Sequence, residues 1–201
     1  MILAIDTSTA ACTAALFDEA GACLARADEL IGRGHAERLV PMIAELLDGR
    51  RATRMLVGVG PGSFTGIRVG IAAAHGLAIG WDAEVLGLSS LALIAAGAGA
   101  APIAVAVRGG HGELFVQQFD AGFAAPTPLL NLPPAEAAAA ITADLVVGNG
   151  AAELVEARGR GDAREAWPSA AEALGLPTAL RSLPPRPLYA RAPDATARVA
   201  A

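Results

Sequence analysis

Residues 2–21 read ILAIDTSTAACTAALFDEAG: a short apolar strand, a polar turn, and a second strand that ends in Phe-Asp. Residues 103–122 read IAVAVRGGHGELFVQQFDAG and repeat this order without gaps. Self-similarity of this kind indicates the duplication of one structural unit. The sequence therefore predicts two related lobes.

A helix and a further strand follow each hairpin. In the first unit the apolar positions of residues 35–48 recur on one side of a helix, and 55–57 form a strand. In the second unit 134–142 is the expected helix and 145–148 the expected strand. Short, uninterrupted apolar strands suit central positions in sheets that are covered on both faces.

The expected fold is therefore α/β, with two tandem lobes built on mixed sheets. The first lobe is predicted over 1–100 and a second, abbreviated lobe over 101–190, followed by a flexible tail over 191–201.

Composition restricts the classes of function. The chain has 201 residues, a net charge of −5 and a pI near 5.2, so it lacks the basic surface that independent nucleic-acid binding needs. The two cysteines are too distant to pair, and no basic leader begins the chain, so a reduced cytoplasmic protein is expected. The uncharged stretch 85–107 is broken by serines, glycines and Pro102, which argues against a membrane span.

A second stretch, GVGPGSFTGIRVG at 58–70, lies between a strand and a helix expected over 63–80. A P-loop needs Gly-Lys-Ser/Thr after its glycines, but the chain contains no lysine. The start of the helix could still accept an anion. The residues considered for such a contact are Asp6, Thr7, Ser8, Gly62 and Ser63.

Small residues recur along this helix. Gly66, Gly70 and Ala74 stand at every fourth position, and each interior glycine costs about 1 kcal/mol relative to alanine. A stripe without side chains lets another backbone approach closely. Packing within the chain and contact with a partner both explain the stripe. A separate apolar stripe of Phe64, Ile67, Ile71 and Ala78 is expected to face the sheet.

The sequence predicts no catalytic motif. Ser8 stands where actin-like folds and sugar kinases carry the glycine of an Asp-x-Gly turn, and Arg108 replaces the acid in the second copy. The three histidines lack the i, i+4 spacing of a helical metal pair, and no serine lies in a nucleophile elbow.

Several segments together resemble the TsaB (YeaZ) family: ILAIDTST, HAERLVPMI, GVGPGSFTGIRVGIAAAHGLAIG, GELF and PLYAR. The resemblance implies two actin-like (ASKHA, RNase H-like) lobes. It also implies a non-catalytic subunit of the bacterial machinery that forms threonylcarbamoyladenosine beside the anticodon of tRNAs reading codons that begin with A. The Arg108–His111 turn departs from the family pattern.

The resemblance further implies partners. Helices 35–48 and 63–80 would pack against matching helices of the catalytic subunit TsaD, through His35, Leu39, Ile43, Ser63, Gly66, Gly70 and Ala74. An ATPase, TsaE, would join the pair, with ATP or ADP and Mg²⁺ near the junction. The chain would meet tRNA only through the complex, and alone would form a homodimer through the same surface. The alternative is a small-molecule kinase or a peptidase of the actin-like superfamily.

Overall fold

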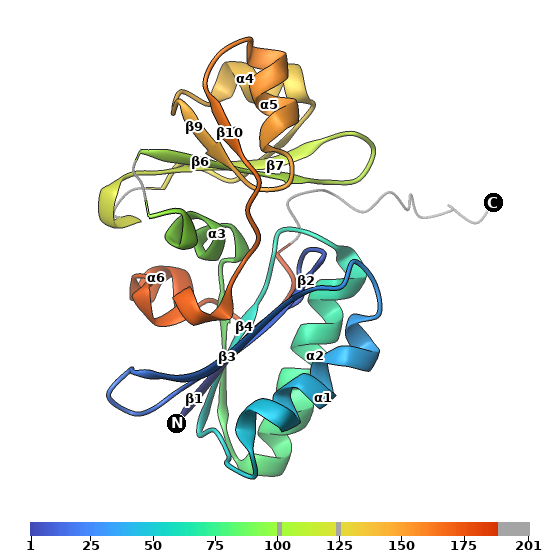
Figure 1. Cartoon of the computed structure of the whole chain (residues 1–201), viewed down its shortest axis with the longest axis vertical. Coiled ribbons are helices and arrows are strands. Elements are labelled where there is room, and N and C mark those ends of the chain that lie inside the picture. The colour runs from blue at the N-terminus through green and yellow to red at the C-terminus, as the bar shows by residue number, and fades with distance from the viewer. Residues whose placement is uncertain (100–101, 124–125, 189–201) are drawn as a thin grey trace, which may run out of the picture.

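Two five-stranded mixed sheets stand one above the other in this computed structural model, which describes residues 1–99, 102–123 and 126–188 (Figure 1). The predicted boundary between the lobes at residues 100–101 and the predicted tail over 191–201 lie outside the described residues. So does the last part of the PLYAR segment.

The first sheet has the strand order β3-β2-β1-β4-β5. Strands β1, β2 and β3 pair antiparallel, whereas β4 and β5 continue the sheet in parallel with β1. Helices α1 and α2 lie together on one face (Figure 1). The bounds are β1 Ile2–Asp6, β2 Ala11–Phe17, β3 Cys23–Leu30, α1 His35–Leu47, β4 Arg54–Gly58, α2 Phe64–Trp81, β5 Glu84–Leu88 and α3 Ser90–Ala98.

The second sheet repeats this arrangement in the order β10-β9-β6-β7-β8, with the same parallel and antiparallel pairings. This equivalence confirms the predicted duplication and the two-lobed α/β fold. Its helices are shorter than their counterparts, as the prediction of an abbreviated lobe requires. The bounds are β6 Ile103–Arg108, β7 Leu114–Phe119, η1 Ala121–Phe123, β8 Leu130–Leu132, α4 Pro134–Ala140, β9 Leu145–Val147, α5 Ala151–Arg158 and β10 Asp162–Arg164.

Alternation along the strands divides the interior into three layers. Leu3 and Ile5 of β1 point toward α1 and α2, while Ala4 points to the opposite face and toward the second lobe. In β6, Val105 faces this central layer, and Ala106 faces the outer layer under α4 and α5. Helix α3 belongs to the central layer, so it packs between the two lobes (Figure 1).

The last part of the described chain returns to the first lobe, which the predicted boundaries do not anticipate. After β10, the 3₁₀ helix η2 (Ala170–Gly175) packs on β2, and its Ala170 amide donates to Thr13 Oγ1 at 2.8 Å. After helix α6 (Thr178–Arg181), Leu183 pairs with Gly87 in β5. Strands of the first lobe are therefore covered by residues that follow the second lobe in sequence.

Within the described part of the chain, no helix combines the length and the hydropathy that crossing a bilayer requires.

Candidate functional site

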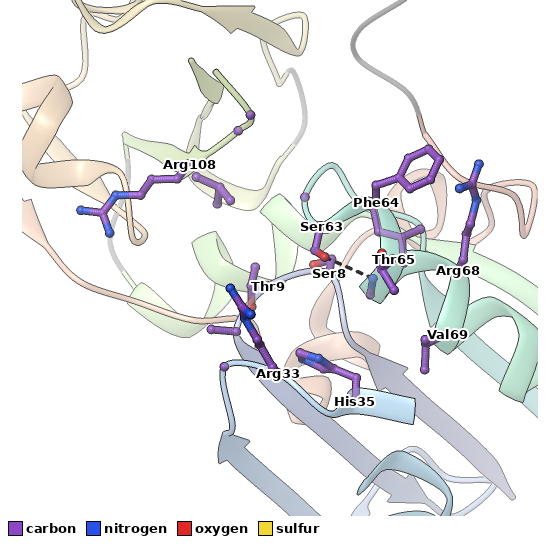
Figure 2. A pocket seen from close by; sticks show the side chains of 18 of the residues that line it. Ser8, Thr9, Arg33, His35, Ser63, Phe64, Thr65, Arg68, Val69 and Arg108 are labelled. Carbon is purple, nitrogen blue, oxygen red and sulfur yellow. Dashed lines mark hydrogen bonds between the residues drawn. The ribbon is translucent and has the colours of Figure 1, made fainter. Parts of the chain in front are cut away.

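A cleft of about 1290 Å³ opens between the two lobes. It lies at the carboxyl ends of β1 and β6, where the turns of residues 8–10 and 108–111 face each other. The start of α2 and the loop before α1 complete its first-lobe wall (Figure 2). Ligands of open α/β folds bind at this edge of the sheet, so the cleft is the first candidate site.

Asp6, at the end of β1, does not reach this cleft because its own neighbours enclose it. Its Oδ1 accepts hydrogen bonds from the Ser8 amide at 2.8 Å and the Ser8 hydroxyl at 2.7 Å, and its Oδ2 accepts one from Ser90 Oγ at 2.5 Å. Burial raises the pKa of the Asp6 carboxyl above its ordinary value, against the lowering effect of hydrogen bonds from Ser90 and Ser8. Both oxygens serve the turn, so the predicted anion contact is wrong for Asp6.

Thr7 is also withdrawn from the cleft. It is buried, and its hydroxyl donates to the Gly66 carbonyl at 2.7 Å. The prediction of an anion contact is therefore wrong for Thr7 as well, because its side chain is used to hold the first turn of α2. Ser8, Gly62 and Ser63 do line the cleft.

The small-residue stripe of α2 is occupied by the chain itself. A Cβ atom on Gly66 would lie 2.0 Å from the Thr7 carbonyl oxygen, and one on Gly70 would lie 2.6 Å from Thr7 Oγ1. Ala74 is fully buried against the sheet. The prediction that Gly66, Gly70 and Ala74 receive a partner helix is wrong, because the turn after β1 fills the space they leave.

Three further residues predicted at a partner interface also point inward. Leu39 and Ile43 of α1 are buried in the layer between α1, α2 and the sheet. The His35 ring is nearly buried, with Nε2 3.2 Å from the Ala11 carbonyl oxygen. These three cannot contact a partner without unpacking the lobe. Ser63 is exposed, but its hydroxyl caps α2 by accepting from the Gly66 amide at 3.2 Å.

The glycine-rich loop before α2 owes its composition to close backbone packing. A Cβ on Gly58 would meet Asp6 Oδ2 at 1.9 Å, and one on Gly62 would meet the Ser8 carbonyl oxygen at 2.1 Å. The Ser63 amide donates to the same carbonyl at 2.6 Å. The loop thus packs closely against the first turn, and this packing accounts for its glycines at positions 58 and 62.

The side chains around the cleft are basic rather than acidic. Arg33, Arg68 and Arg108 come from the loop before α1, from α2 and from β6 (Figure 2). Glu37 also lines the cleft. Arg68 stacks 3.3 Å above the Phe64 ring, and Arg108 pairs with Glu153 at 2.6 Å. A positive lining suits an anion such as a phosphate.

The same residues do not fit a magnesium ion, which prefers carboxylate oxygens. Asp6 Oδ1 and Oδ2 are already hydrogen-bonded, and Arg108 stands at the equivalent point of the second lobe. No group of three or more potential metal-ligating side chains occurs in the described ranges. We therefore derive no metal chemistry from this chain.

A second candidate surface is the outer face of α1 and α2. Ile79, Phe64 and Val40 expose 86%, 59% and 51% of their surface. Phe64, which the apolar stripe predicts to face the sheet, is instead exposed beside Arg68 at the start of α2, where it also lines the cleft. Gly76 and Gly80 lie on the same side of α2 as Ile79, and a Cβ atom added to either would have no neighbouring atom within 4 Å. We call Val40, Phe64, Gly76, Ile79 and Gly80 the outer helical face.

Sequence reasoning missed the outer helical face because α2 is apolar nearly all the way round. A signal was nevertheless present in the sequence. Two glycines four residues apart repeat the small-residue spacing on the other side of the helix, and no contact within the described chain offsets their cost. Ile79 is exposed beside these two glycines, so this part of α2 is a candidate interaction surface.

Proteins of known family share parts of this sequence. Residues 28–124, which contain α1 and α2, match the family model of TsaD, tRNA N6-adenosine threonylcarbamoyltransferase. The tRNA threonylcarbamoyladenosine biosynthesis protein TsaB of Escherichia coli (strain K12) is 39% identical over 127 residues, which are 59% of this chain and 54% of that protein. The Haemophilus influenzae TsaB is 41% identical over 99 residues, which are 47% and 41% of the two chains. The alignments span about half the length of these curated relatives.

Solved structures match over almost the whole length. YeaZ from Pseudomonas aeruginosa aligns with a TM-score of 0.78 and 31% identity, and the match covers 94% of this chain and 98% of that one. A Pseudomonas aeruginosa protein described as similar to peptidase YEAZ aligns with a TM-score of 0.78 and 33% identity, covering 94% and 99%. Both lobes are therefore shared with these structures.

Proposed function

The chain belongs to the TsaB (YeaZ) family, and from this premise we propose that it takes part in the formation of threonylcarbamoyladenosine on tRNAs that read codons beginning with A. Its role is that of a non-catalytic subunit that docks onto a TsaD-type catalytic subunit. The single observation that carries the docking role is the outer helical face, where Ile79 is exposed beside two uncovered glycines and Val40 and Phe64 are exposed elsewhere on the two helices.

The match to the TsaD model supports the choice of partner. Because the match covers α1 and α2, a TsaD-type subunit is expected to carry two corresponding helices. Two related helix pairs can pack face to face around a pseudo-twofold axis, as in isologous interfaces. Gly76 and Gly80 would let a helix of the partner approach closely, and Ile79 would fill a space between its side chains.

The enclosure of Asp6 supports a non-catalytic role. A kinase of the actin-like superfamily needs acids that reach the cleft, but Asp6 is hydrogen-bonded inside its turn and Arg108 replaces its counterpart. A metallopeptidase needs a cluster of ligands, and none occurs among the residues that the structure describes. Catalysis would then reside in the TsaD-type subunit, and this chain would act by favouring its active conformation.

The other implied partners fit the charges of the chain. A TsaE-type ATPase would join the heterodimer, and the basic cleft would face the phosphates of ATP or ADP through Ser63 and the arginines beside it. The net charge of −5 favours contact with tRNA only as part of the complex. A homodimer of the free chain through the outer helical face would compete with docking.

Capture by the catalytic subunit tests the docking role. Ile79→Glu places a charge on the outer helical face near the end of α2, and it should weaken capture of a TsaD-type subunit at least tenfold. Ala157→Glu, on the exposed side of α5 in the second lobe, is the matched control and should bind normally. Capture of Ile79→Glu at the wild-type level would remove the basis of the proposal.

Reconstitution tests the role in the pathway. The chain alone should show no turnover, and threonylcarbamoyladenosine should form on tRNA only when TsaD-type and TsaE-type subunits and a threonylcarbamoyl-adenylate synthase are all present. Calorimetry of the chain alone with ATP and Mg²⁺ separates the alternatives. Tight binding and phosphoryl transfer by the isolated chain would favour a kinase instead.

A further inference from the structure

Strand β3 forms one edge of the first sheet, where its neighbour on one side is β2. The Ile31 amide donates to the Ala10 carbonyl at 3.0 Å, which fixes the direction of the backbone groups along β3. Residues an even number of positions from Ile31 point their N–H and C=O groups toward β2, and residues an odd number of positions away point these groups to the other side of β3. Arg26, Asp28 and Leu30 therefore present their backbone groups to the edge at which no described strand pairs. Leu24 lies at a β-bulge, where the register with β2 shifts between Leu16 and Phe17.

The side chains of these four residues stand on one face of the strand and are exposed. Leu24 and Leu30 expose 47% and 63% of their surface, which is high for leucines in a strand. In the described ranges Arg26 has no hydrogen bond or ion pair within the chain. Asp28 accepts one hydrogen bond, from Thr13 Oγ1.

The order of these side chains is self-complementary. When a second copy of β3 lies antiparallel to the first and the twofold axis passes through Ala27, Leu24 stands opposite Leu30 and Arg26 stands opposite Asp28. Each pair then occurs twice. In the two Arg26–Asp28 pairs both backbones face the new partner, so each pair can exchange two N–H···O bonds. The leucine pairs add side-chain contact, because the bulge at Leu24 interrupts the alternation of backbone groups. A parallel alignment would place like charges side by side, which is unfavourable.

A hollow beside β3 could receive a side chain of the second copy. It measures about 490 Å³, and Leu24 and Arg26 line one side while Ala171 and Glu172 of η2 line the other. The leucine that would stand opposite Leu24 in the second copy comes to the mouth of this hollow. Charged residues on an edge strand commonly prevent pairing, but here their order favours one antiparallel register.

We propose that the free edge of β3 binds a second copy of this chain, joining the two first-lobe sheets into one continuous sheet centred on Ala27. The contact uses the edge of the sheet, whereas the outer helical face lies on α1 and α2. A dimer through β3 therefore leaves the outer helical face available. The two proposals are independent, and each can fail without the other.

Disulfide trapping tests the register. In the proposed dimer the two Ala27 residues form a pair without mutual backbone hydrogen bonds, with Cα atoms about 4.5 Å apart, a distance that a disulfide can bridge. Ala27→Cys in a Cys23→Ser background should yield an oxidised dimer of twice the 20.1 kDa chain mass. Ala25→Cys in the same background is the control, because four residues of offset separate its copies by about 13 Å. Equal trapping at both positions would overturn the proposal.

Charge exchange tests the pairing in solution. Sedimentation equilibrium is performed with Ile79→Glu, which removes the homodimer proposed through the outer helical face. This variant should show a concentration-dependent dimer, and adding Arg26→Asp should weaken it about tenfold, because two attractive pairs become repulsive. The double variant Arg26→Asp/Asp28→Arg restores both pairs and should recover the dimer. Its circular dichroism and thermal unfolding show whether the loss of the Thr13 hydrogen bond is tolerated.

Each outcome decides the question. A dimer that is insensitive to Arg26→Asp, or a folded double variant that stays monomeric, would overturn the proposal. If the double variant does not fold, the trapping experiment alone decides. Arg26→Asp should still be captured by a TsaD-type subunit like the wild type, so failure of the docking role would be visible separately.

Discussion

The carbonyl oxygen of Thr7 occupies the space above Gly66, where a Cβ atom would lie only 2.0 Å away. The turn after β1 and the first turn of α2 are therefore in direct backbone contact, and Thr7 Oγ1 adds a hydrogen bond to the Gly66 carbonyl at 2.7 Å. A glycine within a helix is normally destabilising. Here it is required, because any larger residue at position 66 would collide with the Thr7 carbonyl group.

Alanine substitution at two glycines of α2 should give effects of opposite sign. Gly66→Ala should lower the free energy of unfolding by about 2 kcal/mol, because its Cβ forces the turn away from the helix. Gly76→Ala should raise it by about 1 kcal/mol, because the added Cβ meets open space and restricts the unfolded chain. Urea unfolding measures both. Equal changes in the free energy of unfolding for both variants would contradict the assignment of Gly66 to a packed side of α2 and Gly76 to an open side.

The hydroxyl of Thr13 should hold the returning C-terminal segment on the first sheet. Thr13→Val preserves the shape but leaves the buried Ala170 amide without its acceptor, so the free energy of unfolding should fall by about 1–3 kcal/mol. Thr13→Ser retains the hydroxyl and is expected to lose less. Hydrogen exchange of the Ala170 amide should accelerate in Thr13→Val only, and unchanged protection would contradict the prediction.

Much of the fold follows from the sequence because its signals are local. The duplicated hairpins predict the two sheets, and apolar periodicity places α1 within a residue of its observed bounds. The side of α2 that faces inward could not be predicted in this way. Its residues are apolar almost all round, so the period does not distinguish Gly66 and Gly70 from Gly76 and Gly80.

Contacts between distant segments were also beyond prediction. The hydrogen bond from Ala170 to Thr13 joins residues 157 positions apart, and no local pattern announces it. The enclosure of Asp6 depends in the same way on Ser90, which reaches it from the start of α3. Ser8, Gly62 and Ser63 line the cleft, and their contact with an anion stays a prediction, whereas Asp6 is enclosed by its own neighbours.

The buried carboxyl of Asp6 should make stability depend on pH. Its folded pKa is raised by burial, so below about pH 3.9, the ordinary aspartate value, the group is protonated in both states. As the pH rises the unfolded chain loses this proton first, and the contribution of Asp6 to stability falls until the pH passes the raised folded pKa. Above that pH the carboxyl is ionised in both states, and the loss of stability due to Asp6 no longer changes with pH.

Asp6→Asn removes this dependence. The difference in free energy of unfolding between the variant and the wild type should therefore shift in favour of the variant as the pH rises from about 3.5 to about 7. Contributions from Glu29 and Glu45, whose pKa values are lowered by Arg38, are the same in both proteins and cancel. Urea titrations at several pH values provide the measurement. A difference that is independent of pH would show that Asp6 titrates as an ordinary aspartate.

Two substitutions of Gly76 separate docking from stability. Gly76→Ala and Gly76→Leu should have similar effects on stability but different effects on binding to a TsaD-type subunit. Gly76→Ala and Gly76→Leu both improve the intrinsic helix propensity of α2, and neither added Cβ meets an atom of the chain, so both variants should be at least as stable as the wild type. Only the leucine side chain is large enough to hold a foreign helix away from the backbone at this point.

Capture of a TsaD-type subunit by Gly76→Leu should therefore fall at least tenfold, whereas capture by Gly76→Ala should fall much less. Surface plasmon resonance with the catalytic subunit immobilised would measure both affinities, and thermal unfolding of the same samples would confirm that the helix is intact. If Gly76→Leu binds as tightly as the wild type while Ile79→Glu does not, the partner contacts the end of α2 near Ile79, and the glycines are not part of the contact.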